Sequence, residues 1–507
     1  MSDESVRAPG LSLPGGFDAS LAQFAKIGGF LSGGAAADLE HYELEAYIKA
    51  EGFELLRLLL QDHFDLRAVS EARLEEVTDT KGHAHRAVEG DHERRLATIV
   101  GTVRVRVSRM AYRRRGQQNL YPADAILNLP AGLHSHGVRE LAAVESSRGS
   151  FEEAKEAIRR SSVVNVGHRQ VEELAVATAV DFAAFYDHQP RPTASETEVV
   201  IVSADRKGVA MRPEDLRPAT AKAQAEATPK LRTRRSKGEK PCKRMAEVAA
   251  VYVVEPVARS AAEVLASHGE PDTTKQAPKA KDKWLTASVV EDAATVIAEA
   301  FSEADRRDPE HSRTWVALVD GNNHQISRIK AEAKKRKVKV TIVVDLIHVM
   351  TYLWDAAWCF FAEADPAAER WVGEKALQVL EGKAGLVAGA IRRKATHRHL
   401  SASERKNADT CANYLLAKAP YLDYPTALAK GWPVATGIIE GACRYLVKDR
   451  MALSGARWRL KGAEAVLKLR AIRKSGDWDS YLSFHRAQER ERVHESHYAG
   501  NVIPLAS

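Results

Sequence analysis

Three short apolar runs, each ending on an aspartate, constrain the fold of this 507-residue chain more than any other feature. They are Val199-Val-Ile-Val-Ser-Ala-Asp205, Trp315-Val-Ala-Leu-Val-Asp320 and Val340-Thr-Ile-Val-Val-Asp345. Runs of this length and composition predict strands that are buried on both faces. Further candidate strands lie at about 246–254 and 285–290, with helical patterns near 291–305 and 323–336. This order predicts a mixed α/β sheet with acids at strand ends.

Acids at the ends of buried strands suit a site for divalent metal ions. The strand holds the backbone of each acid rigidly, and oxygens from several strands can converge on two ions about 4 Å apart. Magnesium prefers oxygen ligands and keeps some of its waters, and Mn²⁺ is expected to substitute for it. The alternative for any single aspartate is that it caps the next helix or starts a turn. Asp320 and Asp345 compete for one ligand position, because both end apolar strands.

Four segments resemble, in their order and spacing, the DDE-type insertion-sequence transposases, most closely the Kra-type bacterial family. They are Ser203-Ala-Asp-Arg-Lys-Gly-Val-Ala-Met-Arg-Pro-Glu214, Val319-Asp-Gly321, Asp345-Leu-Ile-His348 and Gly437-Ile-Ile-Glu-Gly441. The later stretch Arg450-Met-Ala-Leu-Ser-Gly-Ala-Arg-Trp458 looks like the same family. The likeness covers about residues 90 to 480.

The resemblance implies a catalytic core with the RNase H-like fold and an all-α insertion before the helix that carries the third acid. Carried over by position, it implies that Asp205, Asp320 and Glu440 are the catalytic acids and that together they hold two Mg²⁺ ions. Asp345 and His348 match the Asp-x-x-His element that follows the second acid in related transposases with a helical insertion. His348 would face the site or DNA, or else be a core histidine held by hydrogen bonds.

Positive charge is concentrated beside the expected catalytic strands. The chain carries 75 Lys and Arg against 68 Asp and Glu, a formal charge of +7. One basic cluster lies within residues 230–244 and a second within 328–339, and two further cations follow Glu440 at four-residue intervals. Such a density of cations suits the neutralisation of phosphates. A solvated surface or a local ion pair also explains any single one of these charges, and burial in the core also explains a tryptophan beside them. We expect DNA contacts from Arg232, Arg234, Arg235, Lys237, Lys334, Lys335, Arg336, Arg444, Lys448 and Trp458.

Composition and periodicity divide the chain into six segments. Residues 1–36 are rich in Gly, Ala and Ser and predict a flexible arm. Residues 37–190 predict an α+β region with amphipathic helices, an alternating strand near 99–107 and a possible helix-turn-helix over about 150–177, where Arg169 and Gln170 open the second helix. The remaining segments are the first part of the α/β core (196–348), the all-α insertion (349–432), the final core helices (433–480) and a C-terminal tail (481–507).

The residues and the resemblance together predict a DNA transposase that cleaves insertion-sequence ends and transfers the strands to target DNA by metal-dependent phosphoryl transfer. Its partners would be double-stranded DNA and at least one further copy of the chain, because two ends must be joined. Two alternatives remain: an RNase H-like nuclease or resolvase that cuts without joining, and a non-catalytic DNA-binding protein derived from a transposase. The four cysteines form no C-x-x-C pair and no apolar run approaches about 20 residues, so we expect a cytoplasmic, nucleoid-associated protein with reduced cysteines and no membrane partner.

Overall fold

The computed structural model describes residues 15–90, 92–105, 110–226, 243–266, 277–435, 437–453 and 455–505. The chain forms two compact units: unit 1 is Met1–Phe185 with Asp479–Ser507, and unit 2 is Tyr186–Trp478. The domain boundary predicted at residue 190 is close to the observed one. Residues 481–507, expected to be a separate tail, belong to unit 1 instead. Within the described ranges, no helix is long and apolar enough to span a membrane.

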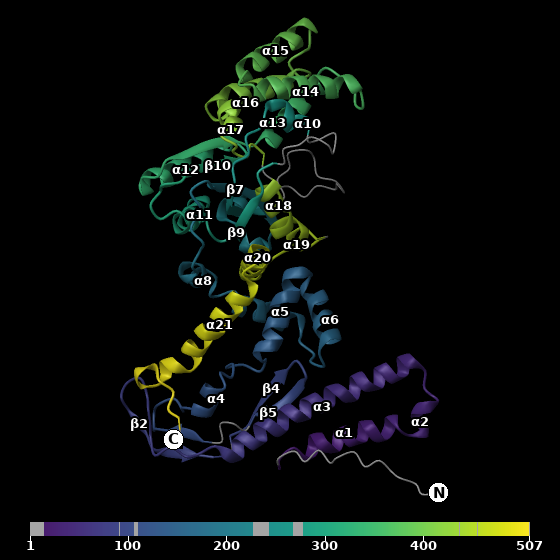
Figure 1. Cartoon of the computed structure of the whole chain (residues 1–507), viewed down its shortest axis with the longest axis vertical. Coiled ribbons are helices and arrows are strands. Elements are labelled where there is room, and N and C mark those ends of the chain that lie inside the picture. The colour runs from purple at the N-terminus through teal and green to yellow at the C-terminus, as the bar shows by residue number, and fades with distance from the viewer. Residues whose placement is uncertain are drawn as a thin grey trace. The chain divides into compact units, whose positions relative to one another are not determined.

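Unit 1 combines helices with short antiparallel strand pairs (Figure 1). Its helices are α1 (Asp18–Leu31), α2 (Gly34–Ala37), α3 (His41–Ser70), α4 (Pro122–Ile126), α5 (His136–Arg148), α6 (Phe151–Ser161) and α7 (His168–Thr178). The strand pairs are β1 (Val77–Thr78) with β2 (Ala84–His85), β3 (Ala87–Glu89) with β6 (Ala111–Arg113), and β4 (Arg94–Thr98) with β5 (Gly101–Val105). Two further helices, α8 (Phe182–His188) and α21 (Trp478–Val493), each contain one boundary between the units.

The flexible arm expected over residues 1–36 is corrected in its described part, residues 15–36, where α1 and α2 form. Two polar contacts fix α1 against α3. The side-chain amide of Gln23 donates to a carboxylate oxygen of Glu51 at 2.6 Å, and Asp62 accepts the backbone N–H of Ser20 at 3.0 Å. Because both acceptors lie on α3, the composition of the N-terminal segment could not reveal them.

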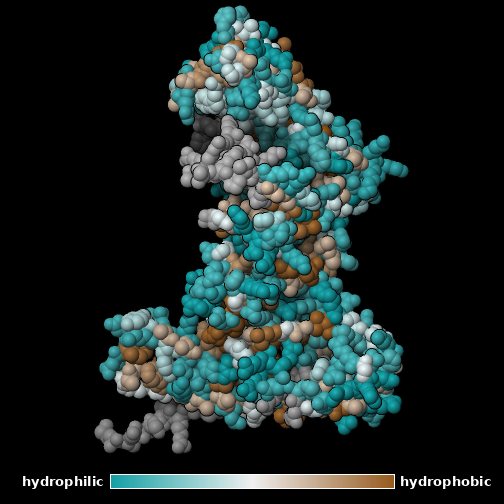
Figure 2. All heavy atoms as spheres, turned by 180° about the vertical axis from the view of Figure 1, so that it is seen from behind, coloured by the Kyte–Doolittle hydropathy of each residue, from teal (hydrophilic) through white to brown (hydrophobic). Residues whose placement is uncertain are grey.

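One apolar cluster of unit 1 lies where the C-terminal half of α3 meets the β4–β5 hairpin. Its members include Phe64, Leu96, Val103, Val105 and Leu129. In β5 the buried residues alternate with the exposed Thr102 and Arg104, which confirms a half-buried strand over 101–105 of the range predicted near 99–107. Ile99 and Val100 lie in the turn before it, and residues 106–107 lie outside the described residues. Other apolar side chains of α1 and α3 are exposed: Phe24, Tyr42, Ile48 and Leu56. Figure 2 shows hydrophobic residues in brown among the hydrophilic ones on one face of the molecule.

Helices α5, α6 and α7 of unit 1 pack around one apolar cluster that includes Val138, Ile158 and Val171. The two-helix outline expected over about 150–177 is present, since α6 begins at a capping box and the loop before α7 ends at Gly167. The side chain of Gln170 accepts the backbone N–H of Gly167 at 3.1 Å, and Arg169 pairs with Glu173 at 3.0 Å. Both side chains expected to read bases are therefore held by partners in their own helix or its cap.

Unit 2 is built on a mixed five-stranded sheet in the order β11-β10-β7-β8-β9. Strands β7 (Val199–Ala210), β8 (Lys243–Val254) and β9 (Ala280–Ser288) are antiparallel neighbours, whereas β10 (Trp315–Val319) and β11 (Val340–Val344) add to β7 in parallel. Helix α11 (Ala293–Arg307) connects β9 to β10, and α12 (Asn323–Arg336) connects β10 to β11. The structure therefore confirms the mixed α/β class and the predicted order of elements.

The remaining elements of unit 2 are helical. Two short helices, α9 (Pro218–Ala225) and α10 (Ala261–Ala266), lie between strands. After β11 come α13 (Leu346–Ala357), α14 (Pro366–Leu380), α15 (Ala384–His397), α16 (Lys406–Lys418) and α17 (Tyr424–Ala429). The chain ends this unit with α18 (Gly437–Ala442), a π-helical turn (Cys443–Lys448), α19 (Asp449–Met451) and α20 (Leu460–Ser475). Between β11 and α18 the described residues contain helices and no strand, as the predicted insertion requires.

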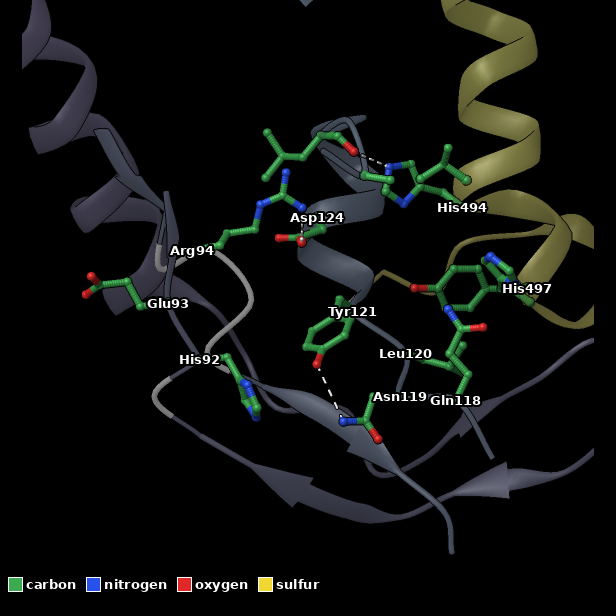
Figure 3. A pocket seen from close by; sticks show the side chains of 14 residues that line it. His92, Glu93, Arg94, Gln118, Asn119, Leu120, Tyr121, Asp124, His494 and His497 are labelled. Carbon is green, nitrogen blue, oxygen red and sulfur yellow. Dashed lines mark hydrogen bonds and ion pairs between the residues drawn. The ribbon is translucent and has the colours of Figure 1, made fainter. Parts of the chain in front are cut away.

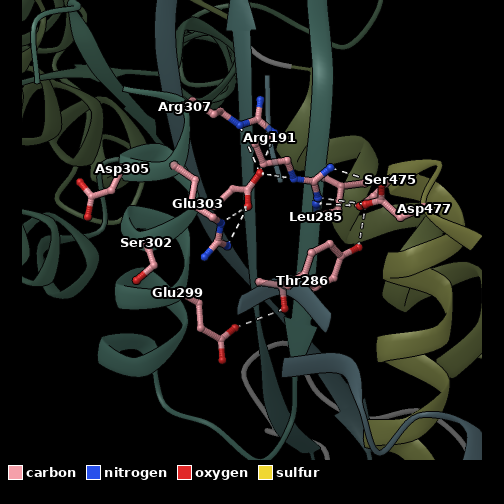
Figure 4. A network of polar contacts seen from close by, with 12 residues as sticks. Arg191, Leu285, Thr286, Glu299, Ser302, Glu303, Asp305, Arg307, Ser475 and Asp477 are labelled. Carbon is pink, nitrogen blue, oxygen red and sulfur yellow. Dashed lines mark hydrogen bonds and ion pairs between the residues drawn. The ribbon is translucent and has the colours of Figure 1, made fainter. Parts of the chain in front are cut away.

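A buried ionic network holds the beginning and the end of unit 2 together (Figure 4). Glu303 on α11 is fully buried and pairs with three arginines at 2.8–2.9 Å: Arg191, Arg306 and Arg307. Arg191 also reaches both carboxylate oxygens of Asp477, at 3.0 and 3.2 Å, and the hydroxyl of Tyr186 donates to Asp477. The network joins the segment after α8 to α11 and to the end of α20.

Candidate active site

Asp205 lies within β7 and not at its end. The predicted strand stopped at this acid, but β7 continues to Ala210 because it stays paired with β8 over its whole length. Asp205 is half-buried opposite Val248. Pairing with β8 therefore fixes its backbone, which is the rigidity that a metal ligand needs.

Asp205 and Asp320 lie side by side on neighbouring strands. Strands β7 and β10 run parallel with Ala204 opposite Val319, so the acid that follows each residue comes at the same level of the sheet. Adjacent strands are about 4.8 Å apart. Burial raises the pKa of Asp205, and the negative charge of Asp320 adds to that rise. The two carboxylates are thus close enough to repel each other.

Asp345 continues the same row but is used as a helix cap. Val344 is opposite Val319 in the parallel pair β10–β11, which puts Asp345 level with Asp320. Asp345 is buried, and its Oδ1 accepts the backbone N–H of Ile347 at 2.7 Å at the start of α13. Oδ1 of Asp320 accepts a backbone N–H in the same way, from Asn322 at 2.7 Å, but Asp320 is half-buried and next to Asp205, so its position suits a metal ligand better than that of the buried Asp345 does.

Glu440 is exposed on α18, which packs against β7 and β8. The helix therefore lies on the strand that carries Asp205. Among the described residues, no group of three or more His, Cys, Asp or Glu side chains is arranged to hold a metal ion. The structure thus brings Asp205 and Asp320 together. Glu440 lies on a helix that packs on the same strand as Asp205, but the three acids do not form a group arranged to hold a metal ion.

The thiol of Cys443 is a member of the site that the sequence did not indicate. Its Sγ lies 3.2 Å from Oδ2 of Asp205, and it is buried. Burial and the charge of Asp205 raise the pKa of Cys443, so the thiol keeps its proton and donates to the carboxylate. Cys443 follows Glu440 by three residues in the sequence, and this closeness to a predicted acid was the available signal.

His348 lies within electrostatic reach of the acid pair. It is half-buried in the first turn of α13, and in its protonated form its charge lowers the pKa of Asp205.

Glu247 is an acid near Asp205 that the sequence analysis did not single out. It lies on β8 opposite Arg206, and burial, together with the charges of Asp205 and Asp292, raises its pKa. Because the pleat points successive residues to opposite faces, Glu247 and Asp205 lie on different faces of the sheet. A single glutamate inside the apolar run of β8 was the signal that could have revealed it.

Two residues expected to contact DNA have structural partners instead. Trp458 is buried, its indole N–H donates to the carbonyl of Met451 at 3.2 Å, and the guanidinium of Arg450 lies 4.4 Å from its ring centre. Its ring is therefore enclosed and does not present a face to an unpaired base. Arg336 pairs with Glu332 at 2.7 Å and with Asp305, which attaches α12 to α11.

The other expected DNA contacts divide into exposed residues and residues without a described position. Lys334, Lys335, Arg444 and Lys448 are exposed. Arg444 and Lys448 were expected to share the face of Glu440, but they lie in a π-helical turn, which changes the angle between successive side chains. Arg232, Arg234, Arg235 and Lys237 lie outside the described residues.

Unit 1 contains a separate polar cavity of about 360 Å³ (Figure 3). Arg94, Tyr121 and Asp124 line it together with His494 and other residues. Burial raises the pKa of Asp124 to about 6, although Arg94 lies 3.6 Å away and opposes the rise. The imidazole Nε2 of His494 bonds to the carbonyl of Leu129 at 2.8 Å, and burial lowers the pKa of that histidine. None of the acids predicted from the sequence lines this cavity.

Comparisons with known proteins assign no family to this chain. No protein-family model matches the chain, and no curated protein matches it significantly.

Proposed function

We propose that this chain is a DNA transposase of the DDE type whose catalytic core is RNase H-like and centres on Asp205, Asp320 and Glu440. One observation carries the proposal: the parallel register of β7 and β10 puts Asp205, within β7, side by side with Asp320 at the edge formed by the carboxyl ends of β10 and β11. The strand order supports the fold, because three antiparallel strands are followed by two parallel strands that are each reached through a helix. The family resemblance supplies the reaction class.

The donor atoms at this edge fit divalent magnesium. Two neighbouring carboxylates repel each other, and the burial that raises the pKa of Asp205 makes a positive partner more favourable. Carboxylate oxygens are the ligands that Mg²⁺ and Mn²⁺ prefer. Asp205 and Asp320 would hold the ions, with Glu440 as the third ligand. Two bound ions would supply charge neutralisation and activation of the attacking oxygen during phosphoryl transfer.

The side chains of the chain itself prepare the site for DNA. Cys443 donates to Asp205 and so limits the orientations of that carboxylate. His348 adds positive charge beside it when protonated. Arg444 and Lys448 are exposed just beyond Glu440, where their cations can attract phosphate. Double-stranded DNA is the proposed partner, and a dimer or larger assembly is proposed because two transposon ends must be joined.

The test is to replace Asp205, Asp320 or Glu440 by Ala and to assay cleavage and strand transfer with DNA ends and Mg²⁺. Each variant should lose both reactions and keep its affinity for DNA. Glu404→Ala, which removes an exposed carboxylate from the helical insertion, is the matched control and should stay active. Full activity in any acid variant would remove that residue from the site.

The same assay separates the alternatives. Wild-type protein that cuts DNA but never joins it would indicate a nuclease or resolvase. Protein that binds DNA and neither cuts nor joins it would indicate a non-catalytic derivative of a transposase.

A further inference from the structure

The helical insertion bonds directly to the turn that carries Asp320. Tyr414 on α16 donates its hydroxyl hydrogen to the backbone carbonyl of Asp320, with an O–O distance of 3.0 Å. One turn further along α16, the buried ammonium of Lys418 donates to the side-chain carbonyl of Asn323. Two side chains of one insertion helix therefore hold both ends of the segment 320–323.

The neighbouring strand end is held in the same way. The hydroxyl of Tyr424, at the start of α17, donates to the backbone carbonyl of Val344 at 2.8 Å and is fully buried. Val344 precedes Asp345 and lies opposite Val319 in the sheet. The insertion thus contacts the carboxyl ends of β10 and β11, in addition to helix α13, which leads from β11 into the insertion.

The turn after Asp320 has a shape that requires this close contact. Gly321 has a φ of +89°, a conformation that L side chains rarely adopt. A Cβ atom at this position would lie 2.8 Å from the hydroxyl oxygen of Tyr414. Oδ1 of Asp320 accepts the backbone N–H of Asn322 at 2.7 Å, so the turn also fixes the acid's own side chain. The aromatic ring of Tyr414 is itself held by stacking on Tyr352, with ring centres 3.9 Å apart.

We propose that Tyr414 is a positioning residue through which the helical insertion sets the geometry of Asp320 as a metal ligand. This inference rests on the proposed function, because it assumes that Asp320 binds a metal ion. Tyr414 acts on the carbonyl of the ligand residue and not on the metal, and loss of such supporting hydrogen bonds typically lowers metal affinity about 10- to 100-fold. The insertion is then part of the active site's support.

Tyr414→Phe removes the hydroxyl and keeps the ring and its stacking. Mn²⁺ binding to the full chain, followed by electron paramagnetic resonance, should weaken about tenfold or more. The metal concentration needed for half-maximal cleavage should rise by a similar factor while affinity for DNA is unchanged. Hydrogen exchange of the segment 319–323 should become faster, because the turn loses its restraint. Tyr421→Phe is the matched control: its hydroxyl bonds to Lys330 at 2.8 Å, away from the turn, and all three readouts should stay at the wild-type level.

Gly321→Ala gives an independent second variant. It should weaken Mn²⁺ binding, and its effect should be smaller in the Tyr414→Phe background, because the atom that its Cβ would meet is then gone. Equal effects in both backgrounds would argue against the close contact.

The proposed function and this inference fail in different ways. If Asp205→Ala leaves Mn²⁺ binding unchanged, the metal is not held at this edge and both are overturned. If Asp205→Ala abolishes binding but Tyr414→Phe binds Mn²⁺ within twofold of wild type, the proposed function stands and the positioning role of Tyr414 is overturned.

Discussion

Cys443 and Asp205, separated by 238 positions in the sequence, meet at 3.2 Å through a thiol-to-carboxylate hydrogen bond. The contact links the helical segment that follows Glu440 to the central strand β7. It connects the third proposed acid with the first even though their carboxylates are not joined directly.

Cys443→Ala should reduce activity more than Cys443→Ser. Serine keeps a donor for Oδ2 of Asp205, whereas alanine leaves a half-buried carboxylate with one donor fewer, a change worth about 1–2 kcal/mol. We expect a loss of cleavage rate of about tenfold for alanine and a smaller one for serine. Single-turnover cleavage rates at saturating Mg²⁺ measure this. Equal rates for alanine and wild type would show that the hydrogen bond does not matter to the reaction.

Glu303→Ala should strongly destabilise unit 2. The substitution leaves Arg307 as a buried cation without its partner and removes one of the two carboxylates that Arg191 contacts, and breaking a buried pair in this way costs about 3–5 kcal/mol. Urea denaturation followed by far-UV circular dichroism would measure the loss. Glu310→Ala removes an exposed acid just beyond α11 and is the control, for which a change below about 0.5 kcal/mol is expected.

Asp124 should make the stability of unit 1 fall as the pH rises from about 4 to about 6. Burial raises its pKa from 3.8 to about 6 in the folded protein, so between these values the folded state binds a proton more tightly than the unfolded state does. Protonation thus favours folding, and that contribution, up to about 3 kcal/mol, is lost by pH 7. Arg94 opposes the shift by stabilising the charged form.

Asp124→Asn is the test of this pH dependence. Asparagine resembles the protonated acid, so the difference in stability between the variant and wild type should increase in favour of the variant across the same pH range. Thermal unfolding at half-unit pH intervals would show it. A difference that does not change with pH would contradict the raised pKa.

Arg336→Ala should affect stability and Lys334→Ala should affect DNA binding, although the sequence analysis assigned both residues to DNA binding. Arg336 pairs with Glu332 and Asp305, so its loss should lower stability by about 1–2 kcal/mol and leave the salt dependence of DNA binding unchanged. Lys334 is exposed, and its loss should reduce the slope of log affinity against log salt concentration by about 1. Fluorescence anisotropy at several salt concentrations measures both slopes. A reduced slope for Arg336→Ala would show that DNA competes successfully for its guanidinium.

The acid pair illustrates what local sequence can predict. A run such as Val199–Val202 or Trp315–Val319 is apolar at every position, and a strand buried on both faces is the structure that satisfies it. The crossover helix between β9 and β10 then makes β10 run parallel to β7. The strands and their directions depend on local composition and connectivity, which is why they could be predicted, whereas the register that brings the acids after Ala204 and Val319 together is set by the packing of the sheet.

Other residues show where such reasoning stops. Trp458 was expected at DNA and is enclosed by Arg450 and Met451, and Arg336 was expected at DNA and holds two helices together. Whether an aromatic ring or a cation faces solvent depends on the elements that pack against it. Those elements come from distant parts of the chain, and the residue's own neighbours in sequence do not indicate which elements they are.

The sequence by itself determined the α/β class and the order of strands and helices in unit 2, because apolar runs and chain connectivity dictate them locally. Tertiary structure alone decided that Cys443 meets Asp205, that Tyr414 holds the turn after Asp320 and that α1 packs on α3. Each of these contacts joins groups separated by dozens to hundreds of residues. Their existence depends on the three-dimensional packing of whole elements, which no local pattern of residues encodes.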